Sequence, residues 1–98
     1  MDFEQIKQKY AGVVKARKKE IIVAQNRVEL TKAKLESWKE VREQFRQDGN
    51  YFSAERAREW RRITYRLQTI EKELSDAEIS LAKAYIGHDI DEEIEKIL

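Results

Sequence analysis

The sequence predicts an all-α protein, a long antiparallel two-helix hairpin of coiled-coil-like character. Three observations support this fold class. The chain of 98 residues has no proline and only three glycines, and 40% of its residues are charged. Two segments carry apolar residues in steps of three and four, and a short glycine-containing segment separates them. The apolar positions are too few for a core of ordinary width, so we expect a narrow helical core. Because the chain is short, we expect residues 1–98 to form a single domain.

The first helix is predicted over about residues 2–47. Its apolar positions recur with the spacing that keeps one stripe of a helix facing one partner. Seven of the ten seam positions are apolar. The seam consists of Val14, Arg17, Ile21, Ala24, Val28, Thr31, Leu35, Trp38, Arg42 and Phe45.

A turn is predicted over residues 48–52, where the sequence reads Asp48-Gly49-Asn50. Glycine is favoured just beyond a helix C-terminus because it reaches left-handed backbone geometry without a side-chain clash. Either Asn50 or Ser53 can cap the following helix by accepting a backbone N–H hydrogen bond.

The second helix is predicted over about residues 53–86, and its seam alternates between steps of three and four without a break. If the chain reverses near residue 50, facing residues have numbers that sum to about 101 or 102. The two seams then align along the whole hairpin. The second seam consists of Trp60, Ile63, Leu67, Ile70, Leu74, Ala77, Leu81 and Ala84.

A third, short helix is predicted over about residues 89–97. Gly87 is expected to end the second helix, and Asp89 with Glu92 three residues later resembles a capping box. The segment that follows would carry an apolar stripe of its own. That stripe consists of Ile90, Ile94 and Ile97.

More apolar residues are present than a two-helix seam can bury. Scattered surface apolar residues are ordinary, but a contiguous patch marks an interaction surface. We therefore expect the surplus residues to bind a second chain and to complete a helical bundle, either as a homodimer or with a different helical protein. This back-face patch consists of Ile22, Val23, Leu30, Ile79, Ala82 and Ile86.

Arginine is concentrated near the expected tip of the hairpin, where residues 42–66 contain seven of the nine arginines and several aromatic residues. Such a composition suits protein interfaces and single-stranded nucleic acid, but solvated ion pairs along a helix are the first explanation and protein contact is the second. The net charge of the segment is only +3, which makes nucleic acid the weaker alternative. The candidate contact residues are Arg42, Arg46, Tyr51, Phe52, Arg58, Arg61, Arg62 and Tyr65.

The sequence carries no motif that indicates catalysis. There is no cysteine, and His88 is the single histidine, so two-histidine and cysteine-ligated metal sites are excluded. Glycine-rich phosphate loops and a nucleophile elbow are also absent. We therefore expect a protein that is not an enzyme, with no metal, no cofactor and no small-molecule substrate.

The longest apolar run extends only from Ile21 to Ala24, so no membrane span is expected. The N-terminus does not have the features of a secretory signal peptide. We expect a soluble, cytoplasmic protein, and export by a route that needs no signal peptide stays open.

The segment Tyr85-Ile86-Gly87-His88-Asp89 resembles the Tyr-x-x-x-Asp tail of the small helical partner proteins of type VII secretion. The Trp-x-Gly turn of that family is absent here. The hairpin is equally similar to flagellar and type III export chaperones and to small phage proteins. None of these resemblances supplies a specific motif, so no family is assigned. The surplus apolar residues and the lack of catalytic motifs favour a non-enzymatic interaction module, of adaptor, chaperone or inhibitor type, that works through helix–helix packing. The alternative is a nucleic-acid-associated protein that uses the arginine-rich segment.

Overall fold

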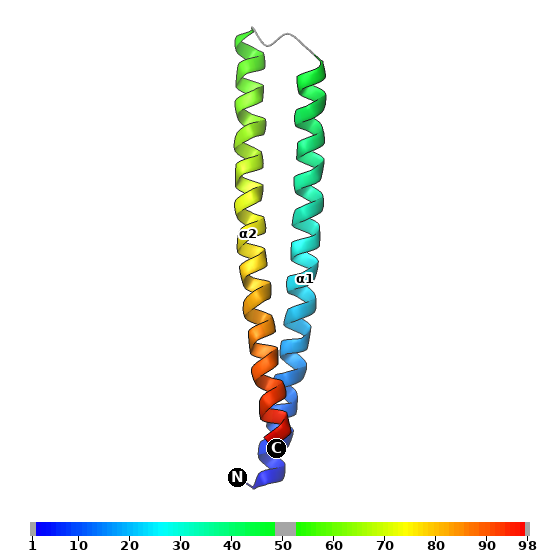
Figure 1. Cartoon of the computed structure of the whole chain (residues 1–98), viewed down its shortest axis with the longest axis vertical. Helices are drawn as coiled ribbons and strands as arrows, with labels where there is room; N and C mark the ends of the chain where they lie inside the picture. Colours follow the sequence, from blue (N-terminus) through cyan, green and yellow to red (C-terminus); the bar gives the residue numbers. More distant parts are fainter. Residues whose placement is uncertain (1, 49–52, 98) are drawn as a thin grey trace. The chain divides into compact units, whose positions relative to one another are not determined.

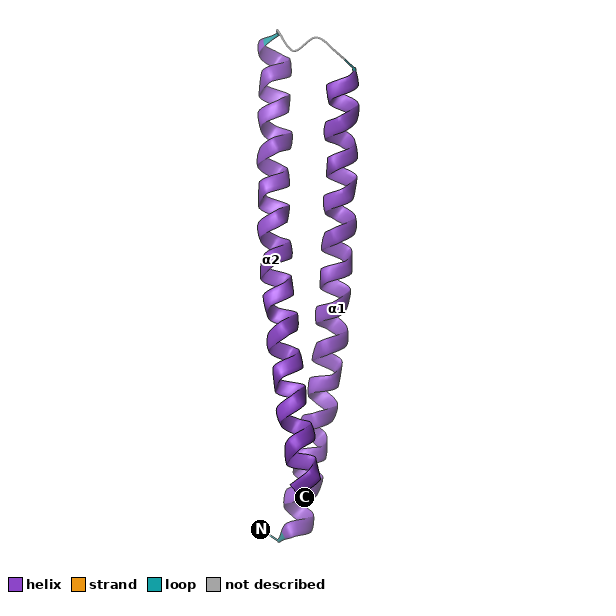
Figure 2. Cartoon of the chain, in the orientation of Figure 1, coloured by secondary structure: helices purple, strands orange, loops and turns teal. Residues whose placement is uncertain are grey.

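The computed structural model describes residues 2–48 and 53–97, which form two long helices. Helix α1 comprises Phe3–Gln47 and helix α2 comprises Ala54–Ile97 (Figure 1). The described residues contain no strand (Figure 2). The predicted all-α class is therefore confirmed.

Both helices begin at a capping side chain. The Asp2 carboxylate accepts a hydrogen bond from the Gln5 amide at 2.8 Å, and the Ser53 hydroxyl accepts one from the Arg56 amide at 3.1 Å. Each bond satisfies an amide that the helix itself leaves without a partner. Of the two caps predicted for the second helix, Ser53 is thus the one observed, whereas Asn50 and most of the predicted turn lie outside the described residues.

The prediction of a third helix over residues 89–97 is wrong, because α2 continues through Gly87 to Ile97. The Gly87 carbonyl accepts a hydrogen bond from Arg17 Nη1 at 3.1 Å. A Cβ atom at position 87 would lie only 3.0 Å from the same nitrogen. Gly87 therefore makes room for an arginine of α1 inside a continuous helix, and Asp89 lies within that helix instead of capping a new one.

The chain divides into two compact units, each of which contains a segment of α1 and a segment of α2 that run in opposite directions (Figure 1). The terminal unit comprises Met1–Val28 and Ala77–Leu98, and the central unit comprises Glu29–Asp76.

The central unit has a narrow apolar core. Its buried cluster consists of Leu35, Ile63, Leu67 and Ile70. Ile70 is fully buried, and Trp38, Phe45 and Leu74 pack against the cluster from positions that are partly exposed. All seven residues belong to the predicted seams, so the seam assignment is confirmed in this unit.

The terminal unit buries Val14 and Ile21 of α1 and Ala77 of α2, again at seam positions. The hydrogen bond between Tyr10 and Asp91 joins residues whose numbers sum to 101, as the predicted register requires. In the central unit the contact of Arg56 with the Phe45 carbonyl has the same sum. Within the described residues, neither helix has a stretch long and apolar enough to cross a membrane.

Candidate functional site

A buried carboxylate joins the two helices of the terminal unit. Asp91 of α2 is only 1% exposed. Its Oδ1 atom accepts a hydrogen bond from the Tyr10 hydroxyl at 2.6 Å and lies 3.2 Å from Arg17 Nη1. Arg17 also binds the Gly87 carbonyl, so one side chain of α1 contacts two successive turns of α2. These contacts fix the register of the helix pair.

The phenol of Tyr10 is held in its neutral form. Its hydrogen bond to Asp91 raises the pKa above the ordinary value of 10.0, and partial burial and the negative charge of Asp91 act in the same direction. Asp91 Oδ2 has no hydrogen-bond partner among the described residues. We therefore interpret Asp91, Tyr10 and Arg17 as a structural cross-link, which we call the Asp91 cluster.

The sequence interpretation missed the burial of Asp91 because it ended the second helix at Gly87. The signal was nevertheless present. Beyond Ala84, the same alternation of four and three reaches His88 and Asp91. The His88 side chain is 23% exposed and Asp91 is buried, so the seam continues with polar residues.

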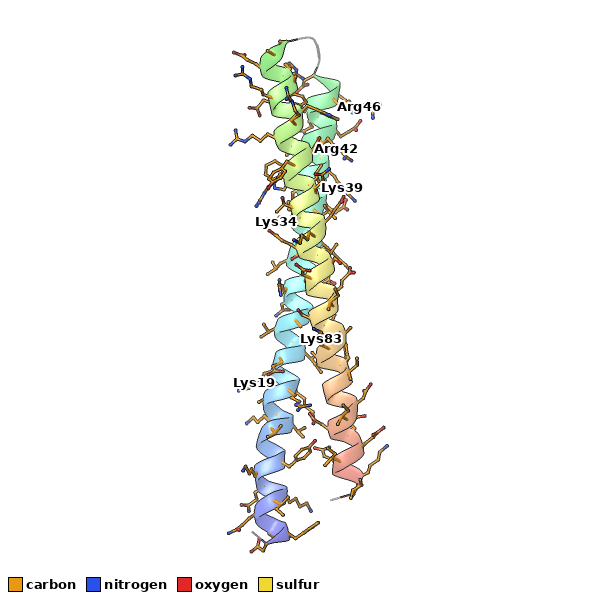
Figure 3. The ribbon with its side chains drawn as sticks, turned by 90° about the vertical axis from the view of Figure 1, so that its left-hand side faces the viewer. Lys19, Lys34, Lys39, Arg42, Arg46 and Lys83 are labelled. Atoms are coloured by element: carbon orange, nitrogen blue, oxygen red, sulfur yellow. The ribbon has the colours of Figure 1, made fainter. Side chains whose placement is uncertain are left out.

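A groove of about 750 Å³ lies on one flank of the terminal unit. Small residues from both helices line it, among them Ala24, Ser80 and Ala84. Basic residues contribute as well, and Figure 3 labels Lys19 on α1 and Lys83 on α2. The groove can therefore accommodate apolar or acidic side chains of a partner.

The structure places the predicted back-face patch on exposed surface. In the terminal unit Ile22 is 57% exposed, and Val23 is exposed at the wall of the groove. Ile79, Ala82 and Ile86 are exposed on α2 of the same unit, and Leu30 is exposed in the central unit. The use of these residues as an interface stays a prediction.

The continuity of α2 reveals a second stripe that the sequence interpretation had divided between two helices. The stripe lies on the outer face of α2, away from the buried seam, and its steps alternate four, three, four, three, four. We call it the outer stripe. It consists of Ile79, Lys83, Ile86, Ile90, Glu93 and Ile97, all of which are exposed.

In the central unit, arginines lie over two of the aromatic rings. The Arg56 guanidinium lies 4.0 Å from the centre of the Phe45 ring and donates to the Phe45 carbonyl at 2.7 Å. Arg66 lies over Trp38 at 5.9 Å. The Phe45 ring centre also lies 6.1 Å from that of Trp60. Several of these aromatic faces are thus engaged within the unit and are less available for stacking on bases.

The remaining candidates of the arginine-rich segment are spread over exposed surface. A pocket of about 470 Å³ gathers Arg46, Arg56 and Arg61 around Ala57 and Trp60. Arg42 and Arg46 lie on successive turns of α1, as Figure 3 shows. Arg58, Arg62 and Tyr65 are exposed elsewhere on α2, and Arg62 lies 3.9 Å from Glu59. Tyr51 and Phe52 lie outside the described residues.

His88, Asp89 and Glu92 form a group of possible metal ligands in the described part of the chain. The two ring nitrogens of His88 lie 3.8 Å from Asp89 Oδ1 and 3.7 Å from Glu92 Oε1. Both carboxylates are exposed, and the three residues follow one another on a single helix. Among the described residues, no hydrogen bond from another side chain orients either acid, as such bonds usually orient metal ligands, so the group does not have the features of a built metal site.

Comparisons of the chain with protein-family models, with curated proteins and with solved structures find no match.

Proposed function

We propose that the chain is a non-enzymatic protein–protein interaction module that acts through helix–helix packing. The observation that carries this proposal is the outer stripe of the terminal unit. Its isoleucines at positions 79, 86, 90 and 97 are 52%, 60%, 49% and 82% exposed. Isolated surface apolar residues are common, but four at heptad spacing on one face resemble a helix that lacks its partner.

The residues of the back-face patch on α1 offer further apolar surface. Ile22 and Val23 add exposed aliphatic area on α1 of the terminal unit. Leu30 is a separate contact point in the central unit. An adaptor, chaperone or inhibitor that binds helical segments would use such surfaces, since burial of an isoleucine contributes about 1.5–3 kcal/mol.

The test compares partner binding by the native chain and by the double variant Ile79→Asp and Ile86→Asp. A protein that co-purifies with the native chain is identified, purified and titrated against both chains. We expect the double variant to lose at least tenfold in affinity while its circular dichroism stays helical. Unchanged affinity of every reconstituted partner, together with unchanged self-association, would refute the proposal.

The arginine pocket of the central unit supports a second candidate function, the binding of single-stranded nucleic acid. Three arginines beside Trp60 offer cationic groups and one partly exposed ring. Salt-dependent binding of generic single-stranded DNA and RNA tests it, with Arg61→Glu compared with the exposed control Lys72→Glu in the same unit. An equal effect of both variants, or no binding at low salt, would exclude a specific site.

A further inference from the structure

The outer stripe of α2 has symmetric spacing, and reversal of its direction exchanges only its lysine with its glutamate. Its residues in order are isoleucine, lysine, isoleucine, isoleucine, glutamate and isoleucine, and its spacing of four, three, four, three, four is also symmetric. The midpoint lies at residue 88. The stripe spans 19 residues, or about 27 Å at the helical rise of 1.5 Å per residue.

Such a stripe is complementary to itself when two copies run antiparallel. Residues whose numbers sum to 176 then face each other across a two-fold axis near residue 88. Ile79 of one copy faces Ile97 of the other, and Ile86 faces Ile90. Lys83 faces Glu93, so the two charged positions of the stripe pair with opposite signs, and each of these contacts occurs twice.

The charges also disfavour the parallel arrangement. In a parallel pair Lys83 would face its own copy, and Glu93 would do the same. Like charges at facing positions are unfavourable, and such pairs commonly determine the orientation of paired helices. The antiparallel arrangement therefore places a favourable partner opposite all six positions, whereas the parallel arrangement does so only for the isoleucines.

We propose that two copies of the chain form an antiparallel, two-fold symmetric dimer through the outer stripe. This inference rests on the proposed function and names the partner as a second copy. A two-fold axis requires that one patch be complementary to itself, and the symmetric spacing and opposite charges of the stripe meet that requirement. Only the two α2 segments would meet at this interface, because the stripe lies on the face of α2 away from α1, and the α1–α2 seam within each copy would stay intact.

The first test measures the mass in solution by sedimentation equilibrium between about 1 and 200 μM protein. We expect the native chain to reach twice its mass of 11.7 kDa. Ile86→Asp should be monomeric throughout this range. The control is Val41→Asp, which places the same charge at an exposed aliphatic residue of α1 in the central unit, outside the outer stripe and the back-face patch, and should stay dimeric. A monomeric native chain at 200 μM, or equal effects of both variants, would overturn the proposal.

Charge exchange tests the register. Lys83→Glu and Glu93→Lys each replace two attractive contacts per dimer by two repulsive ones, and each should weaken the dimer about tenfold. The double variant that carries both substitutions restores opposite charges at every facing pair and should recover the native dissociation constant. If the single variants dimerise as tightly as the native chain, or if the double variant is as weak as they are, the antiparallel register is wrong.

Cross-linking gives an independent readout, because the native chain contains no cysteine. A mixture of Ile79→Cys and Ile97→Cys chains should be joined by a short bis-maleimide. Ile79→Cys alone should not be, since its two copies would lie about 27 Å apart. The opposite pattern would overturn the proposed register.

The two proposals can fail separately. If the native chain is monomeric and Ile86→Asp still abolishes binding of a reconstituted partner, the dimer is wrong and the proposed function stands. If the chain neither self-associates nor loses a partner on substitution of the outer stripe, both are wrong.

Discussion

We expect Arg17→Met to lower the free energy of unfolding by about 2 kcal/mol. Loss of the partner of a buried charge typically costs about 3–5 kcal/mol. Asp91 is buried and lies 3.2 Å from Arg17. The Arg17 side chain is 40% exposed, however, so water already screens part of the attraction. Tyr10 also continues to donate its hydrogen bond, and the expected cost therefore lies below the range for a fully buried pair.

Removal of the whole Asp91 cluster should cost less than removal of Arg17 alone. The triple variant Tyr10→Phe, Arg17→Met and Asp91→Leu leaves no buried charge. It also removes Asp91 Oδ2, which has no hydrogen-bond partner among the described residues. Apolar residues of similar size often replace a buried ion pair without loss. We expect the triple variant to lie within about 1 kcal/mol of the native chain, or to be more stable.

The measurement is urea unfolding followed by circular dichroism, with all chains at one fixed concentration because dimerisation would make stability concentration-dependent. Equal slopes of the free energy of unfolding against urea concentration would show that the variants expose similar surface area when they unfold. If Arg17→Met has the same midpoint of urea unfolding as the native chain, the ion pair contributes nothing to stability. If the triple variant is as unstable as Arg17→Met, the cost arises from lost packing and not from an unpaired charge.

Three further outcomes are expected. Gly87→Ala should raise the free energy of unfolding by about 1 kcal/mol in an Arg17→Met background, because alanine has the higher helix propensity. The gain should be clearly smaller in the native chain, where the new Cβ would lie 3.0 Å from Arg17 Nη1. A double-mutant cycle measures the difference, and additive effects of the two substitutions would contradict the contact. Tyr10 should ionise above pH 10, because its pKa is raised in the folded chain. Its contribution to stability is therefore present below pH 10 and is lost as the pH rises through the folded pKa. The difference in absorbance at 295 nm between the native chain and Tyr10→Phe measures this ionisation, and a midpoint at or below pH 10 would contradict the prediction. Leu74→Ala should lower the free energy of unfolding by about 2 kcal/mol and Ile70→Ala by about 4 kcal/mol, because both side chains pack in the central core but only Ile70 is fully buried. Equal losses in thermal or urea unfolding would contradict this difference in burial.

Much of the fold could be predicted because it depends on local chemistry. The alternation of apolar residues in steps of three and four depends only on helical geometry. Ile63, Leu67 and Ile70 are accordingly buried where the seam placed them. Ser53 caps α2 through a hydrogen bond to a residue three positions away, which a sequence pattern can also indicate.

The candidate site was harder to predict because its key residues act across the helices. The exposure of Ile79 and Ile86 follows from their positions off the seam. The burial of Asp91 does not follow from local pattern, since aspartates are almost never fully buried unless they are paired. Its environment depends on Tyr10 and Arg17, which lie more than 70 positions away in the sequence.

Gly87 marks the division between what the sequence determined and what tertiary structure decided. The sequence alone determined two long helices and their buried seams and limited the cap of the second helix to Asn50 or Ser53, because helical periodicity and capping are properties of neighbouring residues. A glycine followed by Asp89 also looks like a local stop signal. Only the contact with Arg17 shows that the missing side chain accommodates a residue of the other helix. Because α2 therefore continues, isoleucines that seemed to belong to two helices form one self-complementary stripe.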